Sequence, residues 1–167
     1  LYSSAASDVY KRQPQYGGYF HDLNLIENLT AIAEIQIKDN KIRSNTIDKM
    51  ISKFEFDSII NIPAKFLSGG QKKKLVIALA LINDPKVLLL DEPFAALDVL
   101  TIKMLKELIV NLQSQEKISI CICDHQARDL LSCVDNAVIL SNCKIIAKGT
   151  PAELVNDIKA KNAYYGD

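Results

Sequence analysis

The fold of this chain is decided by residues 67–93, LSGGQKKKLVIALALINDPKVLLLDEP. Ser68 and Gln71 have the spacing of a capping box, in which each side chain bonds a free amide at the start of a helix. The run Leu75–Ile82 is apolar on every side, which predicts that this helix is buried. Val87–Leu90 then has the pattern of a short apolar strand. A buried helix followed by such a strand is typical of an α/β protein with a parallel sheet.

The same alternation continues toward the C-terminus. Ile102–Leu112 repeats apolar residues at helical spacing, and Ile118–Cys123 has the pattern of another strand. Ala137–Leu140 and Lys144–Ala147 are predicted as two further strands around a short turn, and Pro151 stands at the favoured first position of a last helix. The sequence therefore predicts an α/β fold with a parallel core sheet.

The N-terminal part of the chain has a different pattern. Two amphipathic helices are predicted within about residues 25–66, the first capped by Asn24 and the second marked by the apolar repeat that begins at Ile47. Residues 1–13, LYSSAASDVYKRQ, have no helical or alternating period and resemble a translated sequencing adapter. We therefore expect residues 1–13 to be a non-native leader and residues 14–167 to be the domain. A native polar loop is the alternative for the leader.

Composition excludes several classes of protein. Of the 167 residues, 49% are hydrophobic and 24% are charged, which is ordinary for a globular domain. The 20 basic and 20 acidic residues cancel, so no overall positive field attracts nucleic acid or an anionic membrane. No apolar run approaches the ~20 residues that span a bilayer. The four cysteines lack a zinc pattern, and Cys121 and Cys123 are interpreted as alternate residues of a buried strand with reduced thiols.

Three groups of residues are candidates for chemistry. Gly69 and Gly70 leave bare amides at the positive end of the predicted helix, which suits close approach of a phosphate. Asp91 and Glu92 follow an apolar strand, where the first could face a metal and the second could deprotonate a water. His125 follows the next strand and is expected at the same sheet edge, in contact with a phosphoryl group. Each group has a structural alternative: a well-formed helix start, acidic residues closing a strand, or a solvated histidine.

Five motifs in the right order resemble those of the ABC-type ATPases, over about residues 14–167. In chain order they are PQ at 14–15 (the Q-loop), LSGGQ at 67–71 (the signature), LLLDEP at 88–93 (Walker B with the catalytic glutamate), ALD at 96–98 (the D-loop) and His125 (the switch histidine). The resemblance implies a P-loop NTPase-like ABC ATPase domain with a partial parallel core sheet and a helical subdomain.

The resemblance also implies a role for each site residue in the hydrolysis of ATP with Mg²⁺. Glu92 would activate the attacking water, and His125 would touch the γ-phosphate. Asp91 would hold Mg²⁺ through water, and Gln15 would sense the metal and the lytic water and couple the site to the membrane domain. Other residues would act across a dimer of two ATPase copies: Asp98 by communicating between the subunits, and Ser68, Gly69, Gly70 and Gln71 by closing on the ATP of the second copy.

One motif of the family is absent from the sequence. None of the six glycines begins the G-x-x-x-x-G-K-S/T pattern of the Walker A loop. We expect that loop to lie upstream, so that this fragment alone is inactive, binds ATP negligibly and exposes strand edges beside the Walker B strand. Val76 and Leu79 are a second departure, because related signature helices commonly carry glutamate and arginine there.

Finer features resemble the ATPases of lipopolysaccharide export. They are the run Asp124–Leu131, FAA at 94–96, the lysines at 72–74 and the ending YYGD at 164–167. This resemblance implies a peripheral protein on the cytoplasmic face of the bacterial inner membrane, which contacts the membrane only through two transmembrane subunits and binds no nucleic acid. For the three lysines, the sequence alone favours a solvated helix turn.

Three alternatives stay open. The ATPase of a branched-chain amino-acid importer or of a phospholipid transporter has the same catalytic motifs and differs only in its partners. A non-transport ABC ATPase of chromosome maintenance or DNA repair carries a long coiled coil, whereas residues 15–67 show no sustained heptad. A catalytically inactive interaction module would leave Glu92 without a function.

Overall fold

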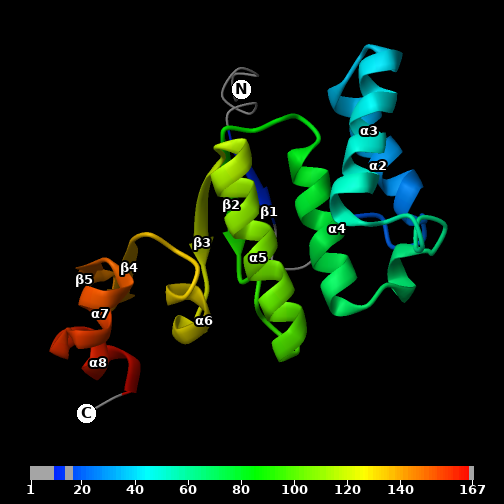
Figure 1. Ribbon diagram of the computed structural model, residues 1–167. Coiled ribbons are helices and arrows are strands. Elements are labelled where there is room, and N and C mark those ends of the chain that lie inside the picture. The colour runs from blue at the N-terminus through cyan, green and yellow to red at the C-terminus, as the bar shows by residue number, and fades with distance from the viewer. Residues whose placement is uncertain (1–9, 14–16, 166–167) are drawn as a thin grey trace. The chain divides into compact units, whose positions relative to one another are not determined.

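The computed structural model describes residues 10–13 and 17–165 and has the α/β architecture expected from the sequence (Figure 1). It divides into two compact units, the first ending at His125 and the second beginning at Gln126. The first unit contains a three-stranded sheet, and the second contains a two-stranded sheet.

A parallel sheet forms the centre of the first unit. Its middle strand is β2 (Val87–Asp91), which pairs with β1 (Tyr10–Gln13) on one side and β3 (Ser119–Cys123) on the other. Leu88 and Leu90 of β2 are 0% and 2% exposed. One face of the middle strand is therefore buried, whereas Val87 and Leu89 on the other face are half-buried.

Two features of this sheet differ from the sequence prediction. The segment Tyr10–Gln13 forms a strand, although it lacks an alternating apolar pattern. Because it pairs with β2, the Walker B strand has a strand neighbour on both sides, so the expectation that its flanking strands are missing is wrong for the described residues. Among those residues, the sheet edge beside the Walker B strand lies at β3, which pairs only with β2. Cys121 and Cys123 alternate along β3 as predicted, but the strand is not buried on their face, because Ser119, Cys121 and Cys123 are all exposed.

Two helices occur where the apolar periodicity predicts them. α2 (Leu25–Gln36) is capped by Asn24, and the side chains of Asn24 and Glu27 form a complete capping box. α3 (Asn40–Phe54) follows, and a short 3-10 helix, η1 (Ala64–Phe66), leads toward the signature turn. The buried side chains of α2 and α3 are Leu25, Asn28, Leu29, Ala33, Ile47, Met50 and Phe54. The grouping of these helices into a separate subdomain stays a prediction.

The signature helix α4 (Gly69–Leu81) lies between the α2 and α3 pair and the sheet (Figure 1). It contacts α2, α3, β1 and the following helix α5 (Val99–Glu116). Six of its side chains are buried: Leu75, Val76, Ile77, Ala78, Leu79 and Leu81. Packing on several sides explains why the sequence of this helix has no polar face beyond its first turns. Val76 and Leu79, the second departure noted in the sequence, are both buried.

Asn28 is a polar residue whose side chain is fully buried. Its Nδ2 donates to the backbone carbonyls of Phe20, Leu23 and Asn24, at 3.0, 3.1 and 3.0 Å. Its Oδ1 accepts a hydrogen bond of 2.7 Å from the backbone N–H of Phe20. Since both ends of the amide are satisfied, its burial is tolerated and the segment before α2 is fixed against that helix.

The second unit contains a β-hairpin flanked by helices. β4 (Ala137–Ser141) and β5 (Lys144–Gly149) pair antiparallel around Asn142 and Cys143, whose φ values of 49° and 59° suit a two-residue hairpin turn. Both strands and the helix that starts at Pro151 occur as predicted. The helices of this unit are α6 (Ala127–Leu131), α7 (Pro151–Asn156) and α8 (Ile158–Tyr165).

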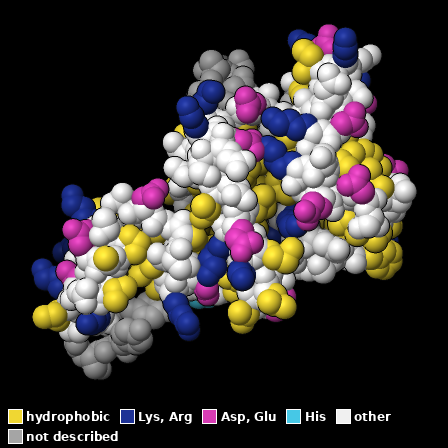
Figure 2. All heavy atoms as spheres, viewed as in Figure 1, with side chains coloured by type: hydrophobic (Ala, Val, Ile, Leu, Met, Phe, Trp, Pro, Cys, Tyr) yellow, Lys and Arg dark blue, Asp and Glu magenta, His cyan; other side chains and the backbone are white. Residues whose placement is uncertain are grey.

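Hydrophobic side chains are exposed at the N-terminal end of α5. Val99, Leu100 and Met104 are 82%, 73% and 51% exposed. Figure 2 shows hydrophobic side chains at the surface around the lower end of this helix. Within the part of the chain that the structure describes, none of the helices combines the length and hydrophobicity needed to cross a bilayer.

We predict that Asn28→Asp strongly destabilises the protein. The change replaces the Nδ2 donor with a second carboxylate oxygen facing three carbonyls, so the free energy of unfolding should fall by about 3 kcal/mol or more. Urea unfolding of the protein expressed from the complete reading frame measures this. The matched change Asn111→Asp, on an exposed residue of α5, should alter stability by no more than about 0.5 kcal/mol. Equal effects of the two changes would contradict the role of Asn28.

Candidate functional site

The candidate residues gather at one end of the first unit. The N-termini of α4 and α5 and the carboxyl ends of β2 and β3 all lie at the lower end of this unit in Figure 1. Asp91, the last residue of β2, pairs with Cys123, the last residue of β3. The residues that follow the two strands therefore share one sheet edge, which is where ligands bind in open α/β sheets.

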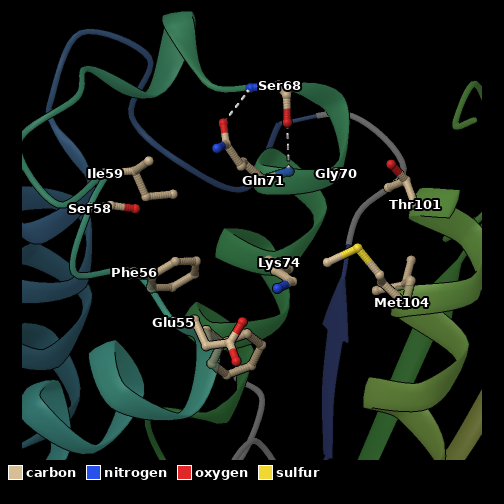
Figure 3. A pocket seen from close by; sticks show the side chains of 12 residues that line it. Glu55, Phe56, Ser58, Ile59, Ser68, Gly70, Gln71, Lys74, Thr101 and Met104 are labelled. Atoms are coloured by element: carbon tan, nitrogen blue, oxygen red, sulfur yellow. Dashed lines mark hydrogen bonds between the residues drawn. The ribbon is translucent and has the colours of Figure 1, made fainter.

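The signature turn forms the predicted capping box. The backbone N–H of Ser68 donates to Gln71 Oε1 at 2.8 Å, and the backbone N–H of Gln71 donates to Ser68 Oγ at 3.3 Å (Figure 3). These two bonds hold the side chains against their own turn. Gly69 and Gly70 lie between them, in the first turn of α4, where backbone amides carry the positive end of the helix dipole.

Both signature glycines pack against the start of α5 and the segment before it. A Cβ on Gly70 would lie 2.4 Å from Thr101 Cγ2, and one on Gly69 would lie 3.3 Å from Leu97 Cδ2. Asp98 holds Thr101 by accepting hydrogen bonds from its hydroxyl at 2.5 Å and from its backbone N–H at 3.0 Å. These bonds from Thr101 lower the pKa of Asp98. The space available at position 70 therefore favours glycine.

Glu92 has an unusual backbone. Its φ is 46°, in the left-handed region that non-glycine residues seldom adopt. Its N–H donates to the carbonyl of Cys123 at 2.7 Å, and its own carbonyl accepts a 2.8 Å bond from Lys73 Nζ on α4. The peptide after the Walker B strand is therefore fixed by both β3 and the signature helix.

The structure brings His125 and Glu92 together. His125 Nδ1 lies 3.9 Å from Glu92 Oε1 and 3.8 Å from Asp124 Oδ1. The Asp124 side chain is fully buried, and its other oxygen, Oδ2, accepts a 3.0 Å bond from the backbone N–H of Phe94. His125 itself is 68% exposed. An accessible imidazole thus stands beside two carboxylates, at the edge where a polar ligand can approach.

Comparison with known proteins decides the family. Residues 5–95, more than half of the chain, match the family model described as ABC transporter. This chain belongs to the ABC transporter family. The matched part includes the signature turn and the Walker B end and stops before Asp98 and His125. It begins inside residues 1–13, whose assignment as a non-native leader stays a prediction.

Relatives and solved structures agree with the family and the fold. The ATP-binding protein LptB of the lipopolysaccharide export system of Haemophilus influenzae is 36% identical over 156 residues, which cover 92% of this chain and 64% of LptB. CbiO1 of Clostridium perfringens, part of the ABC transporter complex CbiONQ, is 24% identical with a TM-score of 0.80, over 93% of this chain and 61% of CbiO1.

A third similar protein was solved as a dimer. This ATP-binding cassette, in a post-hydrolysis state with ADP and Pi, is 20% identical with a TM-score of 0.73, over 86% of this chain and 63% of that one. The chain therefore spans slightly less than two thirds of the length of each of these three proteins.

The acidic residues fit a Mg²⁺ site whose remaining ligands come from a nucleotide and water better than a site built by the protein alone. Among the described residues, no group of three or more His, Cys, Asp and Glu side chains is arranged to hold a metal. Mg²⁺ in phosphoryl-transfer sites usually takes one or two carboxylates and completes its shell with phosphate and water oxygens. Asp91 lies at the carboxyl end of β2, and its role as such a carboxylate stays a prediction. Gln15, the other predicted contact of the metal, lies outside the described residues.

Sequence reasoning missed Lys73 as part of this site. Burial lowers the pKa of the Lys73 ammonium, while the negative charges of Asp124, Glu92 and Asp91 act in the opposite direction. The sequence favours a solvated helix turn for all three lysines. No local signal separates the three lysines, because α4 is apolar on every side one turn later. Lys73 can be told apart from its neighbours only in the folded protein, where the end of β2 brings the Glu92 carbonyl within reach of its ammonium.

We predict that Gly70→Ala destabilises the protein and that Thr101→Ser relieves the effect. The new methyl group would meet Thr101 Cγ2, which cannot rotate away without breaking the hydrogen bond from the Thr101 hydroxyl to Asp98. Overpacking of this kind costs about 1–3 kcal/mol, partly offset by the ~1 kcal/mol that alanine gains over glycine in a helix. Serine removes the clashing methyl and keeps the hydroxyl, so the double variant should be more stable than Gly70→Ala alone. Thermal unfolding of the four proteins tests this, and a single variant as stable as the parent would contradict it.

Proposed function

We propose that this chain forms the greater part of an ATP-hydrolysing ABC subunit that powers lipopolysaccharide export from the bacterial inner membrane. The proposal of ATP hydrolysis rests on one observation: His125 Nδ1 lies 3.9 Å from Glu92 Oε1 at the carboxyl edge of the parallel sheet. A pair of this kind, at the edge where phosphates bind, supports general-base catalysis of phosphoryl transfer to water.

Each residue of the edge has a distinct part in the proposed reaction. The Glu92 carboxylate orients the attacking water and accepts its proton. His125 is exposed and contacts the terminal phosphate, where negative charge must be stabilised during transfer. Mg²⁺ supplies neutralisation of the phosphate charge when it is bound with ATP, and Asp91 is the residue that would hold it through water.

The signature turn is proposed to complete the site of a second copy. The first-turn amides of α4 suit the γ-phosphate of an ATP that the partner holds, and Asp98, together with the exposed Val99 and Leu100, lies beside this turn. Exposed apolar side chains next to the site support a protein interface there. The dimeric cassette with ADP and Pi is a precedent for this arrangement in a protein of similar fold.

The proposed cargo rests on similarity rather than on the site. LptB is 36% identical to this chain, and its name assigns it to lipopolysaccharide export. We accordingly propose a place on the cytoplasmic face of the inner membrane, with two transmembrane subunits making the membrane contact. The ATPase of a branched-chain amino-acid importer or of a phospholipid transporter is the alternative, since it needs the same catalytic residues.

We predict that Glu92→Gln abolishes turnover without abolishing ATP-dependent dimerisation. Loss of a general base typically slows a reaction by about 100-fold or more, and the amide keeps the size of the side chain. Phosphate release and light scattering, both on the protein from the complete reading frame, measure turnover and dimerisation. The matched change Glu107→Gln, at an exposed position of α5, should leave turnover within twofold of the parent. Parental turnover in Glu92→Gln would favour an inactive module.

We predict that the full-length protein copurifies with two transmembrane proteins and that lipopolysaccharide stimulates ATP hydrolysis by this complex in proteoliposomes. Such stimulation requires that cargo binding in the membrane subunits is coupled to the ATPase. Parallel assays with phospholipid alone, and with a branched-chain amino acid and its binding protein, provide the comparison. Stimulation only by one of these other cargoes would overturn lipopolysaccharide export and leave the ATPase assignment intact.

A further inference from the structure

The three consecutive lysines of α4 have three different surroundings. Lys72 Nζ donates at 3.1 Å to the backbone carbonyl of Lys65, which lies in η1, before the start of α4. Lys74 lines a pocket together with Met104 of α5 (Figure 3). Lys73 alone among the three reaches the catalytic edge, where its ammonium donates to the carbonyl of Glu92 at 2.8 Å. Because the three side chains carry the same charge, substituting them one at a time separates the effect of position from the effect of losing a charge.

The carbonyl that Lys73 contacts belongs to a strained residue. Glu92 has φ of 46°, and a non-glycine residue persists in this region only when its surroundings impose it. Hydrogen bonds at both ends of the residue do so here. The Glu92 N–H donates to Cys123 on β3, and the Glu92 carbonyl accepts from Lys73 Nζ at 2.8 Å and from the backbone N–H of Ala95 at 3.4 Å. The Lys73 bond is the shorter of the two at the carbonyl, and it joins this peptide to α4.

The setting of Lys73 favours a specific contact over a solvated one. Its side chain is half-buried, and the carboxylates that act on it are those of Asp124, Glu92 and Asp91. A cation in this position also offsets the repulsion among three acidic groups crowded at one sheet edge. A long flexible side chain that gives up its freedom for this bond constrains the groups it joins.

We propose that Lys73 is a positioning residue, which fixes the backbone of Glu92 so that its carboxylate is aimed at the attacking water. This inference rests on the proposed ATPase function. It links the signature turn to Glu92 through one helix, since Ser68 caps α4 and Lys73, in the second turn of α4, contacts the Glu92 carbonyl.

The test compares Lys73→Met, Lys73→Arg and the control Lys72→Met in the protein from the complete reading frame. Lys73→Met should lower kcat roughly ten- to a hundredfold, the range expected for a lost charge-assisted hydrogen bond, with KM for ATP within about twofold of the parent. ATP-dependent dimerisation should persist, as it should for Glu92→Gln. Lys73→Arg should recover part of kcat, and Lys72→Met should match the parent.

Several outcomes would overturn the inference. They are parental kcat in Lys73→Met, a rise of KM without a fall of kcat, an equal loss in Lys72→Met, or arginine performing no better than methionine. If Lys73→Met does not fold, Lys73→Gln replaces it, and the same split between kcat and KM is decisive. An inactive parent would refute the proposed function and this inference together. An active parent with an inactive Glu92→Gln and a fully active Lys73→Met would refute only this inference.

Discussion

The parallel pairing of β2 with β1 and β3 is the constraint on which the first unit depends. Because β2 is hydrogen-bonded on both sides and buries Leu88 and Leu90, a shift of register by one residue would turn its apolar side chains the wrong way. The carboxyl end of the strand is therefore fixed. Glu92, the next residue, leaves the sheet in a left-handed conformation and reaches the end of β3. The position of every acidic group at this edge follows from that anchoring.

Features that depend on neighbours in the chain could be predicted from the sequence. The capping box at Ser68 and Gln71, the two strands of the hairpin and the burial of α4 each follow from a short local pattern. The approach of Glu92 and His125 follows from one more rule, that successive parallel strands end at the same sheet edge. The fold class and much of the arrangement of the candidate site can thus be predicted from the sequence, whereas the catalytic roles stay hypotheses.

Features that depend on distant partners could not be predicted. Tyr10–Gln13 is not apolar enough to indicate a strand, and it becomes one because β2 offers a row of backbone groups. Cys123 lies on the exposed face of β3, and alternation along a strand does not indicate which sheet face is covered. Lys73 differs from Lys72 only in what lies opposite it after folding.

The contact between Gly70 and Thr101 restricts how the sequence can change over evolutionary time. Since the Thr101 methyl group occupies the volume that a side chain at position 70 would need, the two positions are not independent. A lineage that replaces the glycine first passes through a strained intermediate, whereas one that first exchanges the threonine for serine does not. The order of the two changes, rather than either change alone, determines which of these paths is open to selection.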